Sequence, residues 1–553
     1  MLKTLKEISQ SALAILIFMA PMLSDAEVTF DRILNASNEP ENWLTYNGGY
    51  NSQRFSILDQ VNQTNVENLK LQWTLQNQVF GAWQSNPIVA DGIMYVTERP
   101  NTVIALDAVT GGVFWKYRYD PSPKATVCCG ANNRGVAILG DKVFMGTLDA
   151  RLIAIDRITG VPLWNVEVGD VELAYSVTMA PLVVKNNVLV GVGGGEYGIR
   201  GYVAAYDADT GKEVWKTYTI PAPGEANHDS WEGDDWEHGG APVWITGSYD
   251  SELNLTYWGV GNPGPDWNAG QRPGDNLYSD SVLALDADTG ELQWHFQFTP
   301  NDAYDYDSVQ VPVLADITFN DQLKKVMMWA NRNGYFYVLD RTNGDFLQGK
   351  PYVRVNWSSG LDENGRPIPT PQPDGMPTFP GNQGGTNWYP PSFSPRTELF
   401  YFSAWQDYAT IYKPVEQEYT PGRAFLGGGF SVLAPAPGAP TIGIGRTSPI
   451  NNWTNEVGHA SLKAMDPRTG EAVWSYDQFD VSDSGMLTTG SDLLFTGGRE
   501  GYFHAIDARN GELRWKANLG GQIVMAPITY MAEGVQYISV ISGHALFTFS
   551  LPQ

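Results

Sequence analysis

Residues 302–307 concentrate acidic side chains in one short stretch. Their sequence, DAYDYD, holds Asp302, Asp305 and Asp307 around two tyrosines, and Asp286 lies shortly before them. Carboxylate oxygens are hard ligands that suit a hard cation rather than zinc. Aspartates two positions apart in an extended segment point to the same side, so Asp305 and Asp307 can reach one ion. We therefore expect this stretch to form one wall of a metal and cofactor site.

The two cysteines of the chain, Cys128 and Cys129, are neighbours. Neighbouring α-carbons lie about 3.8 Å apart, which is closer than the roughly 4.4–6.8 Å of ordinary disulfides. A bond between them would close a strained eight-membered ring. We favour this bond over two free thiols, because the export signal described below makes disulfides permissible. The sequence has no Cys-x-x-Cys-His motif, so it predicts no covalently attached haem.

A repeated pattern indicates the scaffold that must position these residues. Each copy has an alternating apolar strand, a turn at Asp and Thr-Gly or Asn-Gly, and a second strand that usually ends in Trp. The full copies are ALDAVTGGVFW (105–115), AIDRITGVPLW (154–164), AYDADTGKEVW (205–215), ALDADTGELQW (284–294), AMDPRTGEAVW (464–474) and AIDARNGELRW (505–515). A seventh copy, VLDRTNGDFLQ (338–348), lacks the tryptophan.

These copies predict an all-β fold, an eight-bladed β-propeller with tryptophans docked between blades. Most copies follow another hairpin, so each unit supplies about four strands. Seven copies account for seven blades, and we place the eighth between Asp340 and Asp466, with a strand at 399–403. The early stretch 69–73 is expected to close the ring against C-terminal strands such as 536–541. Residues 27–553 then form a single domain.

Two stretches rich in proline and glycine, 350–395 and 427–452, fit no blade. They are either solvated loops or a lid over the central channel.

The N-terminus predicts export. Lys3 and Lys6 precede an uncharged apolar run, and small residues follow at Ser24 and Ala26. This pattern is typical of a secretory signal peptide over residues 1–26, too short to span a bilayer, and no later stretch is apolar for long enough. The net charge of −26 argues against binding nucleic acid or an anionic membrane. We expect a periplasmic protein that does not span the membrane.

The stretch CCGANNRG (128–135) resembles the vicinal-cysteine motif of the quinoprotein alcohol dehydrogenases, and the similarity covers nearly the whole mature chain. These enzymes use pyrroloquinoline quinone (PQQ) on an eight-bladed propeller. The resemblance implies that the disulfide of Cys128 and Cys129 lies on one face of the quinone and that Trp244 stacks on the other. It also implies that Arg134 and Arg332 contact cofactor oxygens. Further matches to the cofactor site are Thr178, Gly194, Gly195, Asn387 and Trp388.

The same resemblance implies a metal site. Glu196, Asn262 and Asp305 match the family's ligands, and Asp305 matches its general base. Members that use calcium usually have a small or uncharged residue two positions after the base, whereas lanthanide-dependent members have an aspartate there, as Asp307 is here. A trivalent ion needs more negative charge to balance it, so we favour a lanthanide over calcium.

The resemblance predicts an exported PQQ-dependent alcohol dehydrogenase. It would oxidise primary alcohols to aldehydes by hydride transfer to the quinone and pass electrons to a soluble cytochrome c; a homodimer is a further expectation. The alternatives are a quinoprotein for sugars or polyols and a non-enzymatic scaffold propeller of the envelope. Three positions depart from the family pattern: Gln84, Gly193 and Asp483.

Overall fold

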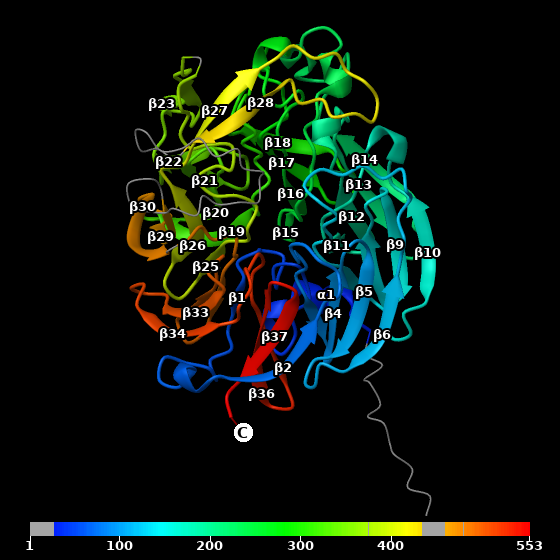
Figure 1. The fold of residues 1–553 in the computed structure, drawn as a ribbon, viewed down its shortest axis with the longest axis vertical. Helices are drawn as coiled ribbons and strands as arrows, with labels where there is room; N and C mark the ends of the chain where they lie inside the picture. Colours follow the sequence, from blue (N-terminus) through cyan, green and yellow to red (C-terminus); the bar gives the residue numbers. More distant parts are fainter. Residues whose placement is uncertain (1–26, 374, 434–458, 479, 553) are drawn as a thin grey trace, which may run out of the picture.

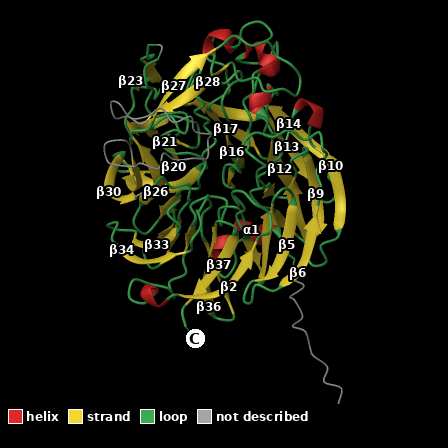
Figure 2. Cartoon of the chain, viewed as in Figure 1, coloured by secondary structure: helices red, strands yellow, loops and turns green. Residues whose placement is uncertain are grey.

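Strand pairing follows the hairpin pattern of the repeats. A computed structural model describes residues 27–373, 375–433, 459–478 and 480–552. Eight antiparallel sheets stand around a common centre, which is filled by the loops that connect them (Figures 1 and 2). The predicted eight-bladed propeller is confirmed. The signal peptide predicted for residues 1–26 and the stretch 434–452 lie outside the described residues.

Five blades each consist of four strands that are consecutive in the chain. They are β3 (Ile88–Ala90), β4 (Ile93–Glu98), β5 (Thr102–Asp107) and β6 (Val113–Arg118); β7 (Ala137–Leu139), β8 (Lys142–Gly146), β9 (Arg151–Asp156) and β10 (Pro162–Glu167); β11 (Leu182–Val184), β12 (Asn187–Gly191), β13 (Tyr202–Asp207) and β14 (Glu213–Tyr218); β15 (Ser248–Asp250), β16 (Leu255–Gly259), β17 (Ser281–Asp286) and β18 (Leu292–Gln297); and β19 (Val313–Phe319), β20 (Gln322–Ala330), β21 (Tyr335–Asp340) and β22 (Phe346–Pro351).

The sixth blade shows that the eighth blade does not lie between Asp340 and Asp466, where we expected it. It joins β25 (Ser392–Ser394) and β26 (Leu399–Gln406) to β29 (His459–Asp466) and β30 (Glu471–Gln478). The strand expected at 399–403 therefore exists, but it shares a sheet with the copy at 464–474 and adds no blade. The seventh blade is β31 (Leu487–Thr489), β32 (Leu493–Thr496), β33 (Tyr502–Asp507) and β34 (Leu513–Asn518), with β1 (Phe55–Ser56) parallel to β31.

The eighth blade unites the two ends of the propeller sequence. It consists of β35 (Ile528–Ala532), β36 (Val535–Ser542), β37 (Ala545–Ser550) and β2 (Lys70–Gln76). The stretch 69–73 closes the ring as predicted, but it pairs with β37 directly and not with 536–541, which lies one strand further in. Blue β2 lies beside red β37 at the bottom of Figure 1.

The repeated tryptophans dock one blade against the next. A Cβ added to Gly160, in the turn of the second blade, would lie 2.7 Å from the ring of Trp115 in the first. The Trp115 indole also donates to the carbonyl of Arg157 over 3.1 Å. In the copy that lacks tryptophan, Gln348 takes this place and packs on Gly470. The expected wedge between sheets is confirmed, and its glycine is required because any side chain would collide with the ring.

The segment 43–58 links the innermost strands of several blades. Trp43 pairs with Val89, Asn51 accepts from the backbone of Leu314, and Gln53 accepts from that of Phe393. Arg54 is fully buried here and donates to the carbonyls of Tyr46, Met486 and Pro527. One segment thus ties together blades that are far apart in sequence.

The remaining elements lie in the connections. Two hairpins, β23 (Ser358–Leu361) with β24 (Pro367–Pro369) and β27 (Ala409–Pro414) with β28 (Gly428–Leu433), stand outside the blades. The helices are short: α1 (Phe30–Leu34), η1 (Ala36–Asn38), η2 (Val66–Asn68), η3 (Val171–Leu173), η4 (Gly195–Tyr197), η5 (His228–Ser230), η6 (Asp235–His238) and η7 (Ala269–Gln271). Among the described residues, none of these helices is long and apolar enough to cross a bilayer.

Candidate active site

Asp305 and Asp307 converge on one arginine. Arg332, which follows β20, donates from Nη2 to Asp305 Oδ2 over 3.0 Å and from Nη1 to Asp307 Oδ2 over 2.7 Å. All three side chains are buried. Asp305 has φ 60°, so residues 305–307 are not extended and our reason for their convergence was wrong. The two carboxylates meet because the left-handed residue turns the chain and one guanidinium fork holds both.

Asp302 and Asp286 have other roles. The Asp302 carboxylate accepts from the backbone N–H groups of Tyr304 (2.9 Å) and Tyr306 (2.8 Å), and so folds the loop that carries Asp305. Burial raises the pKa of Asp302 to about 6. Asp286 accepts from Thr289 in the tight turn after β17 and belongs to the blade, not to the site.

Asn262 and Trp244 approach Asp307 from the neighbouring connections. The backbone N–H of Asn262 lies 3.0 Å from Asp307 Oδ1, and the Trp244 indole N–H lies 3.4 Å from the same oxygen. A Cβ on Gly261 would lie 2.3 Å from that oxygen. Glycine is therefore needed to let the carboxylate reach the Asn262 backbone.

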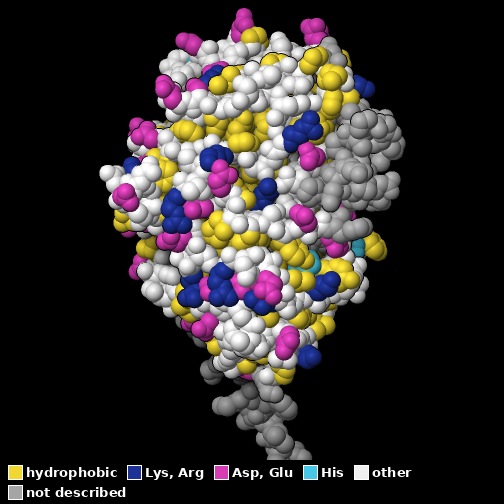
Figure 3. Space-filling model, turned by 90° about the vertical axis from the view of Figure 1, so that its left-hand side faces the viewer, with side chains coloured by type: hydrophobic (Ala, Val, Ile, Leu, Met, Phe, Trp, Pro, Cys, Tyr) yellow, Lys and Arg dark blue, Asp and Glu magenta, His cyan; other side chains and the backbone are white. Residues whose placement is uncertain are grey.

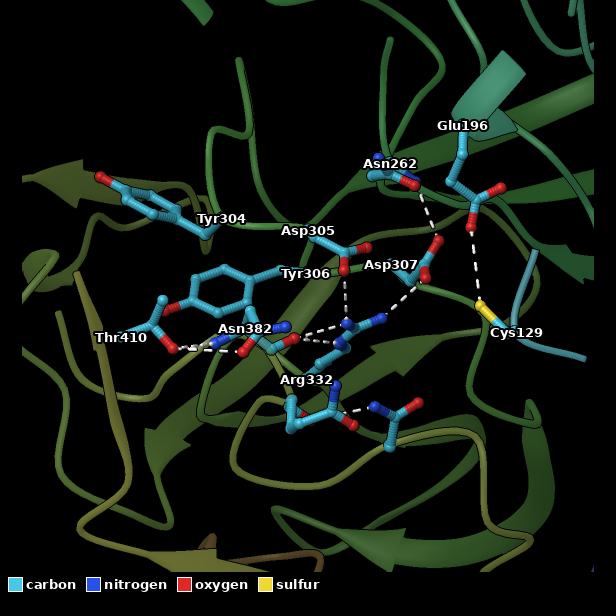
Figure 4. Close-up of polar contacts among 12 residues, drawn as sticks. Cys129, Glu196, Asn262, Tyr304, Asp305, Tyr306, Asp307, Arg332, Asn382 and Thr410 are labelled. Atoms are coloured by element: carbon cyan, nitrogen blue, oxygen red, sulfur yellow. Dashed lines mark hydrogen bonds and ion pairs between the residues drawn. The ribbon is translucent and has the colours of Figure 1, made fainter. Parts of the chain in front are cut away.

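The bonded cysteines lie beside Glu196. Cys128 and Cys129 form a disulfide in the connection between β6 and β7, as favoured above. Cys129 Sγ lies 4.0 Å from Glu196 Oε1, a contact without a hydrogen bond because a disulfide sulfur carries no proton. Figure 4 shows Glu196 and Asn262 on the same side of the Asp305–Asp307 pair. Gly194, with φ 122°, begins the short η4 turn, and Gly195 in it packs on Pro242.

Arg134 lies between two tryptophans. Its guanidinium carbon is 4.9 Å from the Trp244 ring centre and 4.7 Å from that of Trp388, within the range of a cation–π contact. Its Nη1 donates to Thr178 Oγ1 over 2.8 Å. Trp244 therefore connects this aromatic group to the Asp307 group. Asn387 accepts from the backbone of Trp388 and so orients the loop that carries it.

The three departures have distinct surroundings. Asp483 accepts from the Tyr389 hydroxyl over 2.6 Å and from Arg499 Nε over 2.6 Å, in a buried network next to Trp388. Gln84 Oε1 is a buried oxygen without a hydrogen-bond donor among the described residues. Gly193 bonds through its backbone to Ser176.

Sequence reasoning missed two residues that support Arg332. The carbonyl of Asn382 accepts from Arg332 Nε over 3.0 Å, and Thr410 contacts Asn382 (Figure 4). It also missed Asp280, which is 0% exposed. An asparagine and a threonine in loops outside the repeat carry no sequence signal of their own, whereas Asp280 just before an apolar strand could have been noticed as a charge at a buried position.

A family model named for PQQ and described as the glucose/ethanol/alcohol dehydrogenase β-propeller domain matches residues 43–360 and 358–538. The chain belongs to this family of PQQ-dependent alcohol dehydrogenases. The quinoprotein alcohol dehydrogenase PedH of Pseudomonas putida is 37% identical over 94% of this chain and 89% of its own length. The lanthanide-dependent methanol dehydrogenase of Methylacidiphilum fumariolicum is 35% identical over 93% of this chain and 86% of its own.

Solved structures of the family agree in fold. A europium-containing methanol dehydrogenase superposes with a TM-score of 0.86 at 32% identity, covering 94% of this chain and all of its own. The quinohemoprotein alcohol dehydrogenase of Comamonas testosteroni gives 0.84 at 34% identity, covering 95% of this chain and 82% of its own.

The residues present fit the family's cofactor. Arg134 Nε is buried without an acceptor among the described residues, and Gln84 Oε1 is buried without a donor. Arg134 lies between the flat rings of Trp244 and Trp388, and its unused donor there is what a planar, oxygen-rich quinone would satisfy.

The residues present also fit a hard cation. Asp280, Asp302, Asp305 and Asp307 are four buried carboxyls, and Arg272 and Arg332 are the two buried guanidiniums that they face. Both oxygens of Asp280 lack a hydrogen-bond partner among the described residues. Burial and the neighbouring Asp302 and Asp307 raise the pKa of Asp280 well above its usual value. The site thus holds more acidic than basic groups, which favours a bound metal ion.

Proposed function

We propose that the protein oxidises primary alcohols to aldehydes by hydride transfer to PQQ, with Asp305 as the base. The observation that carries this proposal is the geometry of Asp305. It is 2% exposed, has φ 60°, and shares Arg332 with Asp307. A buried carboxylate held in a sparsely populated conformation is typical of a functional site. Family membership favours an enzyme over a scaffold propeller.

The roles of the residues follow from their contacts. When bound, PQQ would supply the hydride acceptor and the metal ion would supply a Lewis acid beside it. Asp305 removes the proton of the alcohol hydroxyl. Arg332 orients Asp305 through Nη2. Its fixed positive charge would also stabilise the negative charge that develops on an oxygen of the reduced quinone. Trp244 and the Cys128–Cys129 ring would bind the two faces of the quinone, and Arg134, Thr178, Gly194, Gly195, Asn387 and Trp388 would surround it.

The metal that we favour is a lanthanide, held by Glu196, Asn262, Asp305 and Asp307, with calcium as the alternative. The support is the charge of the site, because Asp307 adds a second carboxylate beside Asp305, and both are held by one arginine. More negative charge favours a trivalent over a divalent cation.

A reconstitution experiment tests the function. The protein is loaded with PQQ and either lanthanum or calcium, and dye-linked oxidation of a primary alcohol is measured. Activity is expected with lanthanum and not in Asp305→Asn, which should still bind PQQ. No activity with lanthanum or with calcium, or full activity in Asp305→Asn, would contradict the proposal. A sugar or polyol assayed in parallel tests the second candidate substrate class.

Export and electron transfer complete the proposal. Residues 1–26 would be a signal peptide, residues 27–553 one catalytic domain in the periplasm, and a soluble cytochrome c the electron acceptor; a homodimer is the expected assembly. Acidic and basic side chains alternate on the face in Figure 3 and form no single basic patch there. Together with the net charge of −26, this argues against nucleic acid as a partner.

A further inference from the structure

Asn382 presents a buried amide with an unused donor. Its side chain is 2% exposed, and its Nδ2 has no acceptor among the residues that the structure describes. Its backbone carbonyl accepts from Arg332 Nε over 3.0 Å, so the residue lies directly behind the Asp305–Arg332 pair. A buried donor without an acceptor destabilises the folded state and is rare in folded proteins. It therefore indicates an acceptor that is not part of the chain.

Thr410 determines which end of the amide faces the site. The backbone N–H of Asn382 donates to Thr410 Oγ1 over 3.0 Å, so this hydroxyl must direct its own proton elsewhere. It donates that proton to Asn382 Oδ1, at 3.2 Å. The hydroxyl thus holds the oxygen end of the amide and turns the nitrogen end away. In Figure 4, Asn382 lies between Thr410 and Arg332, so the end not held by Thr410 faces the Arg332 side.

The backbone of Thr410 is fixed independently of its side chain. Thr410 lies in β27, pairs with β28, and exchanges two backbone hydrogen bonds with Thr378, at 2.9 and 3.1 Å. Replacing the hydroxyl should therefore leave the hairpin in place and affect only the amide that the hydroxyl holds.

We propose that Asn382 Nδ2 donates a hydrogen bond to an oxygen of the molecule bound beside Asp305, either the quinone or the alcohol, and that Thr410 is the positioning residue that aims it. This assignment rests on the proposed function, because it is that function which puts an oxygen-bearing ligand next to Asp305 and Arg332. The amide is neutral at every pH, so it can bind such an oxygen without changing the charge around Asp305.

The test compares three variants. Asn382→Leu removes the donor, Thr410→Val keeps the shape of threonine without the hydroxyl, and Thr410→Ser keeps the hydroxyl. PQQ affinity is measured by titrating the apoprotein and following its tryptophan fluorescence, and kcat and KM are then measured with saturating PQQ. Thr318→Val, at an exposed position of β19, serves as the matched control.

We expect Asn382→Leu and Thr410→Val to weaken one of these quantities by about fivefold to tenfold, as for the loss of one buried hydrogen bond, and Thr410→Ser to restore it. Weaker PQQ binding assigns the acceptor to the quinone; an altered kcat or KM at unchanged PQQ affinity assigns it to the alcohol. Unchanged values in Asn382→Leu, or equal damage in Thr410→Val and Thr410→Ser, would overturn the proposal. A parent protein that binds PQQ but oxidises no alcohol would refute the proposed function. The PQQ titration of the variants would then still decide whether Asn382 donates to the quinone.

Discussion

Arg332 Nη1 lies 2.7 Å from Asp307 Oδ2, while the other arm of the same guanidinium holds Asp305. Asp305, the proposed base, and its neighbouring carboxylate therefore share one positive charge. Any cation that binds Asp307 competes with Arg332 for it, and the fork geometry transmits that competition to the orientation of Asp305.

Removing the charge of Asp307 should change ion preference. In Asp307→Asn the side chain keeps its size and loses its negative charge, so affinity for a trivalent ion should fall at least tenfold, about 1.4 kcal/mol, and fall less for calcium. Terbium luminescence titration and calcium competition measure both. Asp275→Asn, at a surface pair with Arg366, is the control. An equal loss for both ions would remove the charge argument.

The disulfide should matter for the cofactor and not for the fold. Because Cys128 and Cys129 are adjacent, their bond closes almost no chain and restricts the unfolded state very little. The double change to alanine should leave the free energy of unfolding within about 1 kcal/mol of the parent value while lowering PQQ affinity. Urea unfolding and PQQ titration separate the two effects. A large loss of stability with unchanged PQQ binding would contradict this reading.

Gly160, at a blade junction, and Gly92, in the β3–β4 turn of one blade, allow the cost of backbone strain to be compared with that of a steric collision. Gly160 has φ 73° and would place a Cβ 2.7 Å from Trp115, whereas Gly92 has φ 79° and open space around it. Gly92→Ala should cost only the left-handed conformation, about 1 kcal/mol. Gly160→Ala adds the displacement of a docked ring and should cost roughly 2–4 kcal/mol. Urea unfolding of both variants measures the two losses in free energy of unfolding. Equal losses would mean that the Trp115 ring moves aside at no cost.

Acid should destabilise the protein through His504. Burial, and then the positive charge of Lys516, lower the pKa of this histidine to about 4, below its value near 6.5 in an unfolded chain. Between these values the unfolded state binds the extra proton, so the contribution of His504 to stability is complete above about pH 6.5 and declines as the pH falls towards 4, by about 2 kcal/mol at pH 5. The raised pKa of Asp302 acts in the opposite direction over the same range, so the His504 contribution is the difference between the parent and the His504→Phe variant. His504→Phe should flatten that part of the profile.

The control for this pH effect lies in the same cluster. Tyr476→Phe changes a ring that contacts His504 and removes no group that titrates in this window. It should keep the slope of the parent. Unfolding free energies measured from pH 4 to 7 on the three proteins decide the matter, and a slope retained in His504→Phe would show that other groups cause the acid sensitivity.

The repeat predicted seven of the blades because each copy contains, within a few residues, the features that determine its hairpin. Alternation, an Asp-anchored turn and a docking tryptophan all act within a few residues. The eighth blade was misplaced because none of its four strands belongs to a copy of the repeat, although the closure of the ring by β2 was predicted. Where Gln348 replaced tryptophan, the turn alone was sufficient to identify the copy.

The residues of the candidate site that could be predicted are those whose side-chain type indicates their chemistry. Asp305, Asp307 and Glu196 could be named because carboxylates in loops are conspicuous and resemble a known family. The way in which they converge could not be predicted, because it depends on the left-handed conformation of Asp305, φ 60°, in a loop whose next N–H group is held by Asp302. Asn382 and Thr410 act through a carbonyl and a hydroxyl, groups that no sequence pattern distinguishes.

The joining of β2 to β37 has a consequence for the order of folding. β2 comes before every other blade strand except β1, whereas the three strands that share its sheet, β35 to β37, come last. A chain whose last three strands have not yet paired can form only an open arc of seven blades, in which β2 has no sheet to hold Trp73 against Gly111 of the first blade. Under the proposed export, periplasmic chaperones that shield exposed sheet edges would act on this arc, and the central pocket would be complete only once the C-terminal strands have paired with β2.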